Sequence, residues 1–190
     1  MRPFEFVIVF LSFVYSLGLT HLLFAITRMV RHRRVLVFSW THALWMLNVL
    51  LGLFANWISL WDFHNVAVIS LPALLAGLAM AISNYLVCAL VSPDFEDGET
   101  YDMHAFQARE GRTYLAAYLG LAVVAFAVNY AAAAGVGLTK WASENWIAGT
   151  AIPTLLLPMI VRKRWAEFVA GLVFCALNAV AFVVYYPELS

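Results

Sequence analysis

The sequence predicts an all-α, polytopic membrane protein with six transmembrane helices, the fifth of them short and interrupted by proline. Three observations support this fold class. The chain of 190 residues is 64% hydrophobic and only 12% charged, whereas soluble globular chains are about 45–50% apolar and about 25% charged. Its mean hydropathy is +0.86. The apolar residues form long continuous runs, and the basic residues gather in alternate connections between those runs.

Six runs are predicted as spans, since a crossing helix needs about 20 largely apolar residues. They cover residues 5–27, 35–61, 66–91, 113–138, 146–161 and 165–186. The first run is longer than the apolar core of a signal peptide and ends in a basic cluster at 28–34, so we expect a retained span. Only residues 62–65 separate the second and third runs, which predicts an antiparallel hairpin.

The remaining spans follow the one long connection. Residues 101–109 are predicted as an interfacial helix leading into the fourth span. The fifth run is short and contains Pro153 and Pro158. Proline removes a backbone donor and kinks a helix, so we expect this span to be either broken or thin. The sixth run begins directly after three consecutive basic residues.

The basic residues determine the predicted orientation. Nine of the eleven lie in the connections 28–34, 92–112 and 162–164, and only Arg2 and Lys140 lie on the opposite side. Because cytoplasmic connections are enriched in Lys and Arg, we expect these three connections in the cytoplasm and both termini outside. Trp40 and Trp165 fall at the predicted inner boundary, as expected for residues that concentrate at membrane interfaces.

We expect one domain over residues 1–190, a single helical bundle with an acidic cytoplasmic loop at 92–112. Five carboxylates lie in the first half of the loop, and they are Asp94, Glu96, Asp97, Glu99 and Asp102. Their spacing matches no EF-hand, and no paired-histidine metal motif accompanies them. Docking of a basic partner is therefore the functional hypothesis for this loop, and a solvated loop without such a role is the alternative.

Polar side chains form a layer in the cytoplasmic third of the predicted bundle. His21 lies seven residues before Arg28, and His42 lies seven residues after Val35. Both histidines are therefore expected about 10 Å from the cytoplasmic ends of neighbouring helices. The other candidate lining residues come from spans two to four, and they are Asn48, Ser83, Asn84, Tyr85 and Tyr118.

This polar layer has three interpretations. Its residues line a pocket or path for a small solute, or they form hydrogen bonds that hold the helices together. Alternatively, His21 and His42 ligate a haem b or bind a quinone, with the arginines of 28–34 near the haem propionates. An iron between two imidazoles needs more room than the about 8–10 Å between tightly packed helices, so these two helices would have to splay.

Several classes of function are disfavoured by what the sequence lacks. No Asp, Glu, Lys or Arg lies near the middle of any predicted span, and such residues mark proton relays, coupled transport and voltage sensing. The chain contains no Gly-x-Ser-x-Gly, His-Glu-x-x-His or P-loop motif. Its formal net charge of +0 disfavours nucleic-acid binding.

The sequence therefore predicts a non-enzymatic integral membrane protein. We expect it to bind or pass a small uncharged or weakly polar solute without a cofactor, or to act as a subunit of a larger membrane assembly. The alternative is a membrane redox subunit with haem b or a quinone at His21 and His42. Its expected partners are the lipid bilayer and further copies or other subunits. Small size and short loops suggest a bacterial inner membrane.

Overall fold

The structure, a computed structural model, describes residues 3–64, 70–94, 101–133 and 137–185. Seven α-helices account for most of these residues, and they are α1 (Pro3–Arg31), α2 (Trp40–Ser59), α3 (Leu71–Val91), α4 (Met103–Ala132), α5 (Leu138–Glu144), α6 (Trp146–Val161) and α7 (Arg164–Tyr185). A 3-10 helix, η1 (Leu60–Phe63), extends α2, and two short strands, β1 (Leu36–Val37) and β2 (Tyr101–Asp102), pair with each other. The predicted all-α fold class is confirmed.

Five helices are long and apolar enough to cross a membrane, judged by length and composition. These are α1, α2, α3, α4 and α7, whereas α6 is a shorter apolar helix of 16 residues. The chain thus has the helices of an integral membrane protein. That α6 also crosses the membrane stays a prediction. The six-span topology with both termini outside depends on this crossing and stays a prediction too.

The start of α4 differs from the predicted span. The segment predicted as a separate interfacial helix continues directly into the apolar run, so one helix extends from Met103 instead of from residue 113. Asp102 explains this start, because its carboxylate accepts hydrogen bonds from the backbone N–H groups of His104 and Ala105 at 2.7 and 3.2 Å. Such a cap satisfies donors that the first helical turn leaves without partners.

The two prolines do not break the fifth predicted span, which is a short helix of 16 residues. α6 continues through Pro153 and Pro158, and the helical break lies earlier, at Asn145. In the same helix the hydroxyl of Thr154 donates to the carbonyl of Thr150 at 2.7 Å. The carbonyls that Pro153 and Pro158 leave without their N–H donors are those of Gly149 and Thr154, so this hydroxyl bond does not replace one lost to proline. Of the two predicted outcomes, the structure therefore has the short helix.

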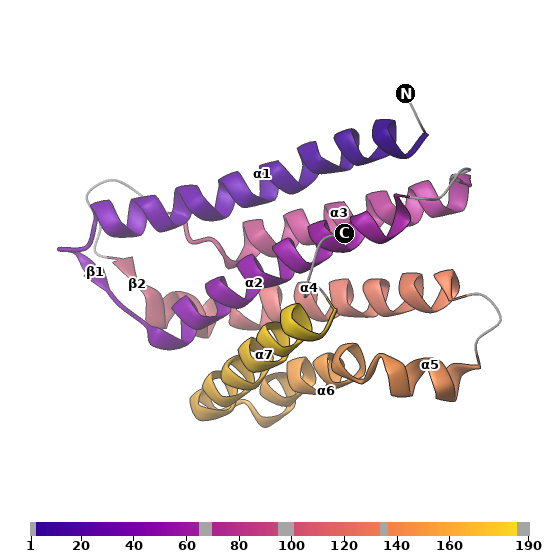
Figure 1. Cartoon of the computed structure of the whole chain (residues 1–190). Helices are drawn as coiled ribbons and strands as arrows, with labels where there is room; N and C mark the ends of the chain where they lie inside the picture. Colours follow the sequence, from indigo (N-terminus) through magenta and orange to yellow (C-terminus); the bar gives the residue numbers. More distant parts are fainter. Residues whose placement is uncertain (1–2, 65–69, 95–100, 134–136, 186–190) are drawn as a thin grey trace.

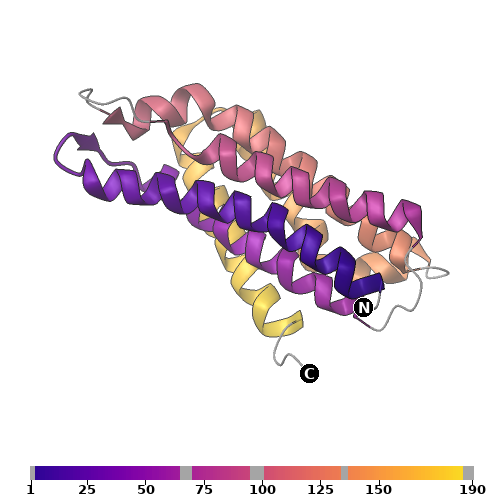
Figure 2. The same cartoon turned by 90° about the horizontal axis from the view of Figure 1, so that it is seen from above.

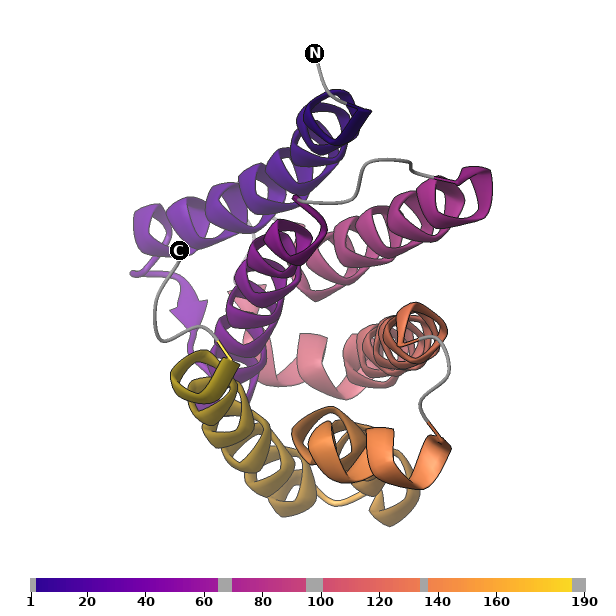
Figure 3. The same ribbon diagram turned by 45° about the vertical axis from the view of Figure 1, so that its right-hand side comes forward.

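The central helix of the bundle is α2, which packs against α1, α3, α4 and α7. The helix α1 lies mainly on α3, while α4 lies between α3 and α6 (Figures 1 and 3). Viewed from above, α7 crosses the other helices obliquely (Figure 2). Small residues permit the close contacts, since a Cβ placed on Gly18 of α1 would lie 3.4 Å from Sγ of Cys88 on α3. Trp45 of α2 is fully buried at the centre.

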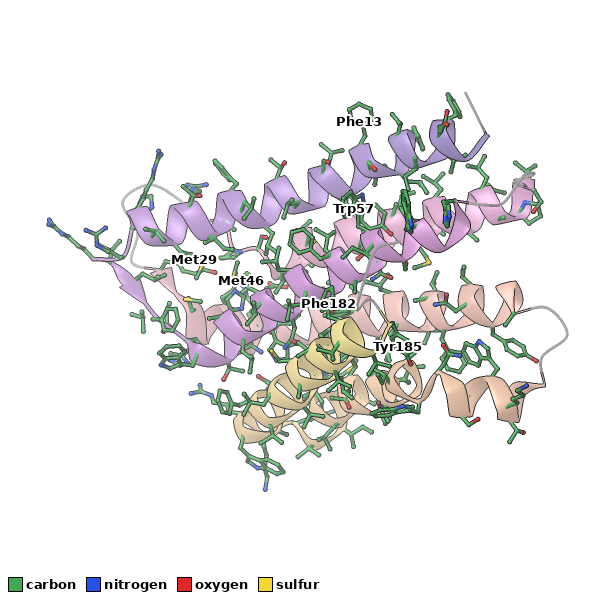
Figure 4. All side chains as sticks on the ribbon, viewed as in Figure 1. Phe13, Met29, Met46, Trp57, Phe182 and Tyr185 are labelled. Atoms are coloured by element: carbon green, nitrogen blue, oxygen red, sulfur yellow. The ribbon has the colours of Figure 1, made fainter. Side chains whose placement is uncertain are left out.

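The outer surface of the bundle is apolar. Phe13 points away from the helices (Figure 4) and is 68% exposed, and Val183 of α7 is 74% exposed. Large apolar side chains that face outward over several helices are costly in water but favourable in hydrocarbon. This surface therefore agrees with helices that lie in a lipid bilayer.

The last turn of α1, the first turns of α2 and α4, and the α6–α7 turn lie at the same end of the bundle (Figure 1). The parallel β1–β2 pair joins two connections there, with Leu36 opposite Tyr101. Burial in this pair raises the pKa of the Tyr101 phenol. We call this the arginine-rich end, after Arg28, Arg31, Arg33, Arg34, Arg109, Arg112, Arg162 and Arg164.

Candidate functional site

A pocket of about 280 Å³ lies at the arginine-rich end, between α2, α4 and the α6–α7 turn. Eight of its ten lining residues are polar or charged, and the ten are Ser39, Thr41, His104, Gln107, Ala108, Arg112, Pro158, Arg162, Arg164 and Glu167. None of the seven residues predicted to line a solute site lines this pocket. It lies beside the predicted polar layer, at the ends of the helices.

Local backbone features place the lining residues. Ser39 is the N-cap of α2, and its buried hydroxyl accepts from the backbone N–H of His42 at 3.5 Å. At the opposite wall, α6 ends at Val161 and its C-cap is Arg162, whose backbone is left-handed with φ 52° and ψ 30°. This conformation reverses the chain within two residues, and α7 begins at Arg164.

Gln107 connects the pocket to the interior of the bundle. Its Nε2 donates to Oε2 of Glu167 at 2.9 Å, and its Oε1 accepts from the hydroxyl of Tyr114. Nδ1 of His42 lies 3.4 Å from the same Oε1, so this nitrogen is the donor. The absence of a side chain at Gly111 makes room for the amide, because a Cβ there would lie 3.0 Å from Nε2 of Gln107. A continuous polar chain thus extends from the pocket to buried side chains.

The predicted candidate His42 lies at the inner end of this chain. It is fully buried, and its ring makes edge contacts with Phe106 at 5.0 Å and Tyr114 at 6.2 Å between ring centroids. Within the described part of the chain, Nε2 of His42 has no hydrogen-bond partner. The histidine is therefore held in one orientation with one nitrogen unsatisfied.

The predicted candidate His21 contacts different residues from those around His42. Its ring packs edge-on against Tyr85 of α3, with 6.2 Å between centroids. Both side chains are half-buried, as is Ser83 on the same helix. The structure therefore brings His21 together with Tyr85 but gives His21 and His42 separate neighbours.

Asn48 and Tyr118 join three helices near the centre of the bundle. Nδ2 of Asn48 donates to the carbonyl of Gly171 on α7 at 2.9 Å, and the hydroxyl of Tyr118 on α4 donates to the carbonyl of Asn48 at 2.8 Å. Gly52 leaves the space for that hydroxyl, since a Cβ there would lie 2.3 Å from it. These contacts are of the kind that holds membrane helices together.

Asn84 forms a similar but looser link. Its Oδ1 accepts from Nδ2 of Asn56 at 3.5 Å, which connects α3 to α2. Its own Nδ2 donates to the carbonyl of Met80 at 3.0 Å within α3. Asn84 is buried, so both groups of its amide have partners inside the bundle.

The acidic loop is described only at its two ends. Asp94 is exposed, and Asp102 caps α4. The other three predicted docking carboxylates, Glu96, Asp97 and Glu99, lie outside the described residues. Across the described ranges, no group of three or more His, Cys, Asp or Glu side chains is arranged to hold a metal ion.

The pocket residues are not among the candidates predicted from the sequence, because other features of the chain account for them. The orientation rule already accounts for the arginines, and Glu167 falls at the start of the predicted span 165–186. A signal was present in the spacing of Gln107, Gly111 and Tyr114, which fall four and three residues apart and so share one helical face.

No protein-family model, curated protein or solved structure matches the chain.

Proposed function

We propose that the protein is a membrane-embedded helical bundle that binds a small polar solute in the pocket at its arginine-rich end. The supporting observation is the chain of hydrogen bonds from Glu167 through Gln107 to Tyr114 and His42. Such a chain fixes the polar wall of the pocket before any ligand arrives, and a fixed wall lowers the entropic cost of binding.

The orientation predicted from the basic residues places this pocket on the cytoplasmic side. In that orientation the solute reaches the pocket from the cytoplasm or from the inner leaflet. The proposed role is binding without catalysis, because the polar wall provides an amide and a carboxylate but no activated nucleophile.

Blocking the pocket tests this proposal. Ala108 lines the pocket, whereas Ala105, also exposed on α4, does not. We expect native mass spectrometry of protein purified from its own membrane to show a retained small molecule that is lost in Ala108→Trp and kept in Ala105→Trp. Equal retention in both variants, or no retained molecule in the unmodified protein, would contradict the proposal.

The redox alternative, with haem b or a quinone at His21 and His42, has one supporting observation. Nε2 of His42, the kind of nitrogen that ligates iron or binds a quinone carbonyl, is buried without a partner among the described residues. An absorption spectrum of the natively purified protein tests it. A Soret band that disappears in His21→Ala and His42→Ala supports haem ligation, and a colourless, stable protein excludes it.

A further inference from the structure

Three arginines from two parts of the chain converge on the pocket. Arg112 lies in the third turn of α4, while Arg162 and Arg164 flank the α6–α7 turn. Glu167 is the one carboxylate of the lining, so the lining has a surplus of two positive charges. Among the described residues, none of the three guanidinium groups forms an ion pair.

The carboxylate of Glu167 is already engaged. It accepts from Nε2 of Gln107 at 2.9 Å, and Gln107 is only 6% exposed. The buried amide thus holds the carboxylate at the pocket wall by a charge-assisted hydrogen bond. The three guanidinium groups remain the donors that a ligand can use.

Arg162 occupies a backbone position that favours glycine. It is the one non-glycine residue with positive φ in the described part of the chain, and it caps α6 with its N–H on the carbonyl of Pro158 at 3.3 Å. A residue with a Cβ is sterically strained in this conformation. Strained backbone positions cluster at functional sites. The strained backbone of Arg162 beside the pocket therefore supports a role of its side chain in binding.

The pocket also lies at the level of the membrane surface. Trp40, next to Ser39, is 76% exposed, and Trp165, next to Arg164, is 57% exposed. Exposed tryptophans of membrane helices concentrate at the headgroup region. The pocket is therefore placed where both lipid headgroups and dissolved anions can reach it.

We infer that the ligand of this pocket carries a phosphate group, bound by Arg112, Arg162 and Arg164; this inference rests on the proposed function. A guanidinium group binds phosphate through two parallel hydrogen bonds. A terminal phosphate (a monoester or inorganic phosphate) offers at least three free oxygens to three such groups, whereas a carboxylate offers two. Basic pockets between membrane helices are suited to phosphate-bearing headgroups, and a soluble phosphate compound presents the same chemistry.

Two binding measurements on the full chain in maltoside micelles distinguish the sources of phosphate. The first titrates the protein with inorganic phosphate, and the second with dioctanoyl phosphatidic acid, a phosphate monoester whose phosphate-free counterpart, dioctanoylglycerol, is the control. Tryptophan fluorescence is the readout, because Trp40 and Trp165 directly follow the lining residues Ser39 and Arg164 in the chain. Binding of either phosphate probe supports the inference, and the tighter probe identifies the source.

Substitution of the arginines tests the assignment. We expect R112Q, R162N and R164Q each to weaken binding of the phosphate probe by about tenfold or more, the scale of a lost charged hydrogen bond. Asparagine at 162 removes the charge and tolerates the left-handed backbone. R33Q is the matched control, since Arg33 is an exposed arginine of the same end outside the pocket. Size-exclusion profiles and unfolding midpoints equal to those of R33Q verify folding.

The inference is overturned if neither phosphate probe binds, if dioctanoylglycerol binds as tightly as the phospholipid, or if R33Q loses as much affinity as the pocket variants. The proposed function has its own readout. Loss of the natively retained molecule in Ala108→Trp without any phosphate binding leaves the binding function standing and removes only the phosphate assignment. An unchanged Ala108→Trp removes the proposed function itself.

Discussion

Gln107 and Glu167 join the N-terminal parts of α4 and α7 through a hydrogen bond of 2.9 Å from Nε2 to Oε2. These helices are 60 residues apart in sequence at this point. The same glutamine also accepts from Tyr114 and from His42. One side chain therefore supports both the wall of the pocket and the packing of three helices.

Replacing this glutamine is expected to destabilise the protein. Gln107→Leu leaves Tyr114 and His42 without their acceptor, and an unsatisfied buried polar group costs about 1–3 kcal/mol. The free energy of unfolding, measured by SDS titration in mixed micelles, should fall by at least this amount. Thr113→Leu, an exposed polar position on the same helix, is the control and should change little.

A double-mutant cycle separates this network from general packing. If Gln107 acts through Tyr114, then Gln107→Leu should cost less in a Tyr114→Phe background than in the unmodified protein. Fully additive effects of the two substitutions would contradict the network.

A second prediction concerns the close approach of α2 and α4. In Gly52→Ala the added Cβ would lie 2.3 Å from the Tyr118 hydroxyl, so the tyrosine must move and lose its hydrogen bond to the Asn48 carbonyl. Overpacking of this kind costs about 1–3 kcal/mol. Gly120→Ala on α4 is the matched control, because its Cβ meets nothing within 4 Å. Thermal unfolding should show a lower midpoint for Gly52→Ala only.

The contact itself is tested by removing the obstructing atom. Tyr118→Phe lacks the hydroxyl, so adding Gly52→Ala to it should cost less than adding Gly52→Ala to the unmodified protein. An equal cost in both backgrounds would show that the hydroxyl does not determine the spacing of the helices.

The sequence predicts some features of the structure and not others, depending on whether the feature leaves a pattern in neighbouring residues. The apolar run at 146–161 has the same bounds as α6, because polar or charged residues adjoin it at both ends. The β1–β2 pair is not predictable, since two residues on each side carry no pattern and the partners lie 65 positions apart. The pocket is not predictable from the sequence, because arginines at helix ends are already explained by the enrichment of basic residues in cytoplasmic connections. That enrichment is the same whether or not a cavity lies between the arginines.

The number of crossings gives a third prediction. If α6 spans the membrane, Lys140 before it and Lys163 after it lie on opposite sides. Both side chains are exposed. In a Cys88→Ala/Cys175→Ala background, K140C in intact cells should react with an impermeant maleimide, whereas K163C should react only after permeabilisation. Labelling of both positions from one side would show that α6 does not cross and that the six-span topology is wrong.

The last prediction separates the charge of Arg162 from its backbone. Arg162→Ala and Arg162→Gly both remove the guanidinium group, but only glycine adopts φ 52° without a steric cost. The glycine variant should therefore be more stable than the alanine variant by about 1 kcal/mol. At Ala116, an exposed helical position of α4, Ala116→Gly should instead lower stability by about 1 kcal/mol. If Arg162 has been retained for binding, both Arg162 variants should lose affinity for inorganic phosphate equally while differing in stability. Higher stability of the alanine variant would contradict the strained backbone, and unchanged phosphate affinity would show that the arginine at this position has no role in binding phosphate.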